Sequence, residues 1–101
     1  MTDLTLVAVP VLAPGVVGRI VNNEAVLVLT KQNRVEVLNE VGARIWSLVD
    51  GRHSVGAIAA QICIEYQVEQ TEAERDTLEL VASLVDRGAF VLSPGAAASQ
   101  E

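Results

Sequence analysis

The residues best suited to acid–base or nucleophilic chemistry in this chain are one histidine and one cysteine. His53 lies in the short segment Gly51–Ser54, with no second histidine and no nearby cysteine to complete a metal site or orient a general base. Cys63 lies between two isoleucines in an apolar segment, with no cationic neighbour that would favour its thiolate form. We therefore expect an exposed loop histidine, a small buried cysteine and no catalytic residue.

A run of acidic residues is the other feature that could carry chemistry. It includes one local counter-charge, Arg75, and its acidic members are Glu65, Glu69, Glu72, Glu74, Asp76 and Glu79. Such a run can hold a cation or face a basic partner, but its usual meaning is a solvated helix surface. The sequence has no glycine-rich phosphate loop and no Cys-x-x-Cys pair. We expect no metal, no cofactor and no enzymatic activity.

Length and charge limit the class of protein further. A chain of 101 residues forms one domain, and a formal net charge of −6 argues against a nucleic-acid partner. The apolar stretch Leu4–Leu12 follows Asp3, is broken by Pro10, and is too short to cross a membrane. These features predict a cytoplasmic protein with no membrane partner.

Composition divides the chain into three parts. Residues 1–15 are apolar and interrupted by Pro10, Pro14 and Gly15, which predicts an extended arm. The arm either lies across its own domain or pairs with a second copy, and we favour the first because termini are loosely held unless they are docked. Residues 16–92 form the predicted domain. Residues 93–101 are small and polar, and we expect them to be disordered.

Three runs rich in valine and leucine predict strands at Val17–Val21, Ala25–Thr30 and Arg34–Leu38. The spacers Asn22-Asn23 and Lys31–Asn33 suit tight turns, because asparagine tolerates positive φ. Connections this short make neighbouring strands antiparallel. The third strand would then lie at an edge of the sheet, with unpaired backbone donors and acceptors.

Three helices should follow the strands. Asn39 is a suitable N-cap for the first, which we expect to end at Asp50-Gly51, and Ser54 is a suitable N-cap for the second. The segment Thr71–Glu74 has the pattern of a capping box for the third helix, and Ala89–Leu92 suggests a short final strand. The predicted fold class is α+β: a three-stranded antiparallel meander followed by three helices, similar to a winged helix.

A winged helix raises the possibility of DNA binding. Its third helix would enter the major groove, but the segment from Thr71 to Val85 has one basic residue against four acidic ones. An edge strand beside a broad apolar helix instead suits an extended peptide, which adds a strand to the sheet and places alternate side chains in pockets.

The ordered pattern of residues from Ala25 to Leu92 resembles the family of coenzyme PQQ synthesis protein D, also known as precursor peptide recognition elements. The matching residues are Val26–Leu29, Val35–Leu38, Asn39, Gly42, Ile45, Trp46, Asp50, Gly51, Ser54, Val55, Ile58, Tyr66, Asp76 and Gly88. Val41 and Thr77 depart from the family pattern. The resemblance implies a non-catalytic peptide chaperone that holds the leader of a ribosomally made precursor peptide.

The resemblance also implies a partner and a site. The partner would be a modifying enzyme, such as a radical S-adenosylmethionine protein, a protease or a cyclase, in PQQ biosynthesis or in another peptide pathway. The family's groove lies between the third strand and the third helix. Carried onto this chain, the strand side comprises Arg34, Val35, Glu36, Val37 and Leu38, and the helix side comprises Asp76, Thr77, Leu80 and Leu84.

Two alternatives remain open from the sequence. One is a DNA-binding winged helix. The other is a structural domain that self-associates, as a homodimer formed through the edge strand or the N-terminal arm.

Overall fold

The computed structural model describes residues 5–93. Residues 1–4 of the predicted arm and residues 94–101 of the predicted disordered tail lie outside this range. The elements are β1 (Pro10–Leu12), β2 (Val16–Val21), β3 (Glu24–Leu29), β4 (Arg34–Leu38), α1 (Glu40–Ser47), α2 (Val55–Tyr66), α3 (Gln70–Asp86) and β5 (Phe90–Leu92). The predicted fold class is confirmed, because a three-stranded antiparallel sheet precedes three helices.

The sheet has the order β2-β3-β4, and both pairs are antiparallel. The turn between β2 and β3 consists of Asn22 and Asn23, which have φ values of 53° and 65°. Two consecutive residues with positive φ are typical of the type I′ turn, whose twist matches that of the flanking strands. Asn33, with φ of 55°, ends the second turn in the same way. The asparagines therefore fix the meander, as the sequence predicted.

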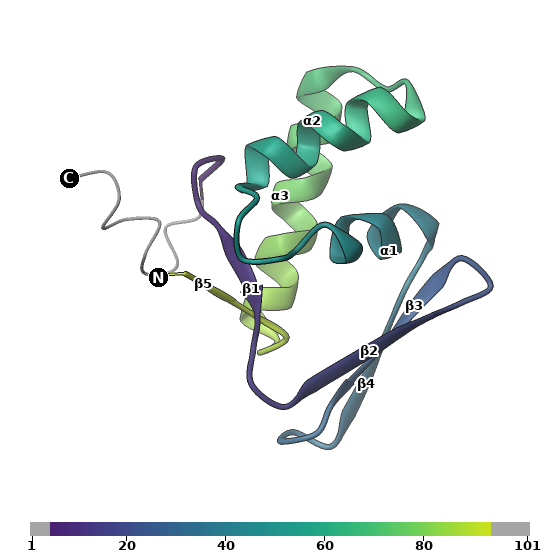
Figure 1. Ribbon diagram of the computed structural model, residues 1–101, viewed down its shortest axis with the longest axis vertical. Helices are drawn as coiled ribbons and strands as arrows, with labels where there is room; N and C mark the ends of the chain where they lie inside the picture. Colours follow the sequence, from purple (N-terminus) through teal and green to yellow (C-terminus); the bar gives the residue numbers. More distant parts are fainter. Residues whose placement is uncertain (1–4, 94–101) are drawn as a thin grey trace.

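Helix α1 packs on one face of this sheet, α2 packs against α1 and α3, and α3 also contacts β5 (Figure 1). The buried face of β3 consists of Ala25, Leu27 and Leu29, each at most 1% exposed. The opposite face of the sheet carries exposed valines. One continuous apolar core joins β3, the inner faces of the helices, and Phe90.

Two of the three predicted helix starts are correct. The side-chain oxygen of Asn39 accepts a hydrogen bond from the Gly42 N–H at 2.9 Å, and that of Ser54 accepts one from the Ala57 N–H at 3.1 Å. Each N-cap satisfies an N–H group that has no partner inside its helix. The prediction for α3 is wrong: this helix begins at Gln70, so Thr71 lies inside it, and no side chain caps its start.

The end of the first helix also differs from prediction. The first helix ends at Ser47, before Asp50-Gly51, because the N–H groups of Leu48 and Val49 bond to the carbonyls of Ile45 and Trp46 in a tightened last turn. Gly51, with φ of 81°, serves the loop that follows. The second helix ends at Tyr66, and Gln67 follows it as a C-cap in the left-handed conformation.

The N-terminal arm lies against its own chain in residues 5–12. The carbonyl oxygens of Leu6 and Ala8 accept hydrogen bonds from the N–H groups of Gly56 and Val55, both at 2.8 Å, at the start of α2. Further along, β1 pairs antiparallel with β5, which makes a two-stranded ribbon separate from the sheet (Figure 1). The predicted strand near residue 90 therefore exists, and its partner is the arm.

Candidate functional site

The outer edge of β4 presents unpaired backbone groups. A two-residue hairpin is closed by a hydrogen-bonded pair, here Val21 and Glu24, and hydrogen-bonded pairs alternate along an antiparallel ladder. It follows that Ala25, Leu27 and Leu29 bond to β4, and their partners there are Leu38, Glu36 and Arg34. The N–H and C=O groups of the two remaining residues of β4 must point outward. In the part of the chain that the structure describes, no strand lies along that edge.

The two residues of β4 with outward backbone groups are Val35 and Val37. Their side chains are each 60% exposed and lie on the open face of the sheet, opposite the helices. The side chains of Arg34, Glu36 and Leu38 point to the helix side, since they pair with the inward residues of β3. The predicted strand side of the site is therefore an edge in which backbone groups, more than side chains, are available for pairing.

Glu36 connects this edge strand to the end of α3. One of its carboxylate oxygens lies 2.6 Å from Nη1 of Arg87, and the other lies 3.1 Å from Nη2 of Arg34. The Glu36 side chain is 11% exposed, while the two arginines are about half exposed. Charge-assisted hydrogen bonds of this kind hold the partners in a fixed geometry. They place the outer edge of β4 next to the C-terminal end of α3.

A cavity of about 500 Å³ lies between α1 and α3, where β4 ends. Its lining residues are Asn39, Val41, Gly42, Ile45, Asp76, Glu79, Leu80 and Ser83. Two predicted groove residues, Asp76 and Leu80, are among them. The cavity begins at Asn39, the residue after β4, and lies along α3, whose C-terminal end reaches the edge strand through Arg87 and Glu36. We refer to the cavity and this edge together as the candidate groove.

Two other predicted wall residues lie elsewhere. Thr77 and Leu84 are 0% and 1% exposed and point into the core. They lie seven residues apart, on the same helix face as Ala73 and Val81, which are also buried. The residues of α3 that line the cavity follow Asp76 at three, four and seven positions: Glu79, Leu80 and Ser83. The prediction combined two faces of one helix, and this spacing would have separated them.

Gly42 forms part of the cavity floor in the first turn of α1. A Cβ atom at this position would lie 3.1 Å from Cβ of Leu38 and 3.6 Å from Cδ2 of Leu80. The first distance is tighter than an ordinary carbon–carbon contact, so glycine lets α1, β4 and α3 approach one another here. The apolar floor of the groove depends on this close approach.

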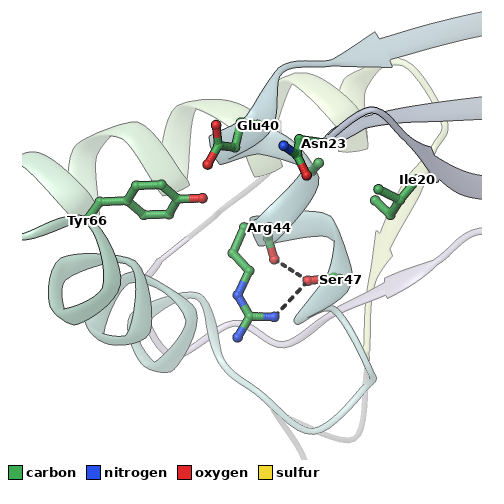
Figure 2. Close-up of a pocket in the computed structure, with 7 residues that line it drawn as sticks. Ile20, Asn23, Glu40, Arg44, Ser47 and Tyr66 are labelled. Atoms are coloured by element: carbon green, nitrogen blue, oxygen red, sulfur yellow. Dashed lines mark hydrogen bonds between the residues drawn. The ribbon is translucent and has the colours of Figure 1, made fainter.

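A second cavity, of about 230 Å³, lies on the other side of α1 (Figure 2). Tyr66 and Glu40 point into it, and Arg44 and Ser47 form its far wall (Figure 2). The Arg44 guanidinium makes two hydrogen bonds with Glu65, at 2.8 and 2.7 Å, which join α1 to α2. These bonds, together with one from Gln61, lower the pKa of Glu65 from 4.5 to about 2. The second cavity does not adjoin β4.

His53 and Cys63 take no part in either cavity. The His53 ring lies 3.0 Å from the Asp50 carboxylate, and this contact, with two backbone N–H groups, lowers the pKa of Asp50 to about 2. The Cys63 thiol donates to the Val68 carbonyl oxygen at 3.1 Å. Within residues 5–93, no three acidic, histidine or cysteine side chains are grouped to hold a metal ion. No helix in that range is long and apolar enough to span a bilayer.

Comparison with known proteins relates this geometry to a family. No curated protein matches the chain in sequence. Among solved structures, TbiB1 in complex with the TbiA(beta) leader peptide has a TM-score of 0.74 and 29% identity, over 79% of this chain and 93% of that one. Lasso peptide synthetase B1 complexed with its leader peptide has a TM-score of 0.74 and 30% identity, over 81% and 96%.

A third solved structure comes from Methylobacterium extorquens. It is the PqqD truncation of PqqCD, described as a functional, stand-alone recognition element for ribosomally synthesised and post-translationally modified peptides. It has a TM-score of 0.75 and 28% identity, over 89% of this chain and 96% of that one. The family described as coenzyme PQQ synthesis protein D matches residues 24–89, about two-thirds of the sequence. The chain belongs to this family.

Proposed function

We propose that this protein is a non-catalytic, cofactor-free module that binds the leader segment of a ribosomally made precursor peptide. The leader adds to the sheet as a fourth strand beside β4, and the module presents it to a modifying enzyme. The observation that carries the proposal is the open edge of β4, where the backbone groups of Val35 and Val37 point outward and have no partner strand among residues 5–93. Two of the similar structures are complexes with leader peptides, which supports the same function.

The groove suits an extended peptide on physical grounds. A strand added at an edge gains main-chain hydrogen bonds along its length, and every second side chain turns toward the helices. The cavity of about 500 Å³ is large enough to receive such side chains. The pathway, whether PQQ biosynthesis or another, and the modifying enzyme depend on the precursor.

Proline substitution tests strand addition directly. Val37→Pro removes one outward N–H group and leaves the β3–β4 ladder intact, so the protein should stay folded and lose leader binding. The matched control is Ile20→Pro. On β2, Ile20 occupies an outward position of the opposite edge, because its partner Ala25 bonds to β4.

The measurement is calorimetric titration with a synthetic leader of the precursor peptide encoded beside this gene. We expect micromolar or tighter binding for wild type and Ile20→Pro, and at least a tenfold loss for Val37→Pro. Equal affinity of wild type and Val37→Pro would contradict strand addition.

The two alternatives from the sequence make different predictions. A DNA-binding protein would bind duplexes in a strongly salt-dependent manner, but α3 carries acidic residues and a single basic one, Arg75. A self-associating structural domain would form dimers as concentration rises, and the leader would not compete with dimer formation. Sedimentation with and without the leader distinguishes this alternative from the proposed function.

A further inference from the structure

The groove has opposite electrostatic character at its two ends. At the end near β4's first residue, Arg34 and Arg87 are both paired with Glu36. At the other end, Asp76 and Glu79 border the cavity. Asp76 contacts only Arg75, at 3.5 Å with both side chains more than half exposed, and Glu79 has no ion-pair partner among residues 5–93. The first end therefore has two positive charges against one negative charge, and the other end has two negative charges with Arg75 as their nearest counter-charge.

The floor beneath the two acids is apolar. Val41, Ile45 and Leu80 line it, and Gly42 adds no side chain. A residue that enters here from an added strand would bury an aliphatic side chain. Its neighbour on the same face lies two positions along the strand, about 6.6 Å away. Asp76 and Glu79 line the same cavity as the apolar residues, so a second side chain can lie beside them.

We infer that this end of the groove selects a leader with an aliphatic residue and a lysine or arginine two positions from it. The inference rests on the proposed function and specifies the peptide class that the site accepts. A long basic side chain packs its methylene groups along the apolar floor and places its charge near Asp76 and Glu79. These two residues lie one helical turn apart, about 4.5 Å along α3, so one cation can approach both. The net charge of −6 attracts basic peptides at longer range.

A random 12-residue peptide library, selected by display against the full chain, tests the inference without knowledge of the natural precursor. Selections run in parallel on wild type, Val37→Pro, the double variant Asp76→Asn/Glu79→Gln, and the control Glu69→Gln/Glu72→Gln. The control removes the same number of charges from exposed positions that do not line the cavity. It therefore separates a local effect from the effect of net charge.

We expect peptides that depend on Val37 and are enriched in the aliphatic–basic pair, with the enrichment lost for Asp76→Asn/Glu79→Gln and kept for the control. Replacing the basic residue of a selected peptide by norleucine should weaken binding about 2–5-fold, as expected for contacts with partly exposed charges. Peptides that depend on Val37 but show no basic preference would overturn this inference and leave the proposed function standing. A basic preference equal in all acidic variants would also overturn it. If no peptide depends on Val37, both fail.

Discussion

Thr77 is completely buried on α3, and its hydroxyl oxygen has no hydrogen-bond partner in the part of the chain that the structure describes. A buried hydroxyl without a partner lowers stability, because it loses its bonds to water on folding. The substitution Thr77→Val keeps the shape of the side chain and removes the hydroxyl. We expect the free energy of unfolding to rise by about 1 kcal/mol, measured by urea denaturation.

A second variant separates the hydroxyl from the methyl group. Thr77→Ser keeps the hydroxyl and removes a buried methyl, so its free energy of unfolding should fall by about 1 kcal/mol. Because Thr77 faces the core, neither variant should change leader affinity. A less stable Thr77→Val protein would show that the hydroxyl has a bonding partner after all.

Individual residues were predictable where their role is local. The capping roles of Asn39 and Ser54 depend on a few adjacent residues, and both predictions are confirmed. Whether the Thr77 side chain points to the core or to the groove could not be predicted in the same way. Its neighbour Asp76 lines the groove, while Thr77 itself packs into the core. Helical spacing separates Thr77 from Asp76 and Leu80, but which of the two faces meets the groove depends on the rotation of α3 about its own axis, and that rotation is set by the whole core.

The pairing of Arg44 with Glu65 links two helices, and its contribution depends on pH. The guanidinium holds the pKa of Glu65 at about 2, below its ordinary value of 4.5. A lowered folded-state pKa means that the stabilisation is fully present above pH 4.5 and disappears as the pH falls toward 2. We expect Glu65→Gln to be less stable than wild type at pH 7, with a difference that shrinks between about pH 5 and pH 2. Urea denaturation at several pH values measures this difference.

The control for this experiment is Glu69→Gln. Glu69 is exposed and has no ion pair among the described residues. Its substitution should therefore show no comparable pH dependence. The lowered pKa of Asp50 acts equally in all three proteins and cancels from the differences. A stability difference for Glu65→Gln that stays constant from pH 7 to pH 2 would contradict the role assigned to the ion pair.

Helices and strands were predicted correctly from the sequence where their hydrophobic pattern was long. The three strands of the meander and the three helices were all predicted, with strand boundaries within one residue. The start of α3 was not, because the helix begins at Gln70 behind the extended residue Glu69, and no side chain caps it. The capping-box pattern of Thr71–Glu74 therefore did not mark the true start of the helix.

The arm and the domain are joined by contacts that are distant in sequence. The carbonyls of Leu6 and Ala8 bond to the first N–H groups of α2, and β1 covers Phe90 through its pairing with β5. Removing residues 1–12 should cost about 2 kcal/mol, which for a chain of this size lowers Tm by roughly 8–16 °C. Circular dichroism on heating measures the change. Leader affinity at low temperature should stay within about twofold, because the arm does not line the groove.

A point substitution in the arm serves as the control. Val7 is 63% exposed, so Val7→Ser should leave Tm nearly unchanged. An unchanged Tm after truncation would mean that the arm contributes nothing to the fold. Loss of leader binding by the folded, truncated protein would mean that the arm belongs to the site.

The β1–β5 ribbon was the part of the fold that the sequence did not predict in full. The strand near residue 90 was predicted, but its partner was not. β1 has only three residues and begins with a proline, which gives little strand signal. Its partner lies about eighty residues away. Pairing between such distant and short segments depends on how the helices bring them together.

Glu36 also has a consequence for the resistance of this protein to aggregation. An open strand edge is a template on which other chains can stack into aggregates, and an inward-pointing charge is one way in which natural sheets discourage this. Glu36 is such a charge, held in place by two arginines. Glu36 is therefore a feature that would oppose indiscriminate stacking of copies on this edge, because such stacking would disturb its ion pairs with Arg34 and Arg87.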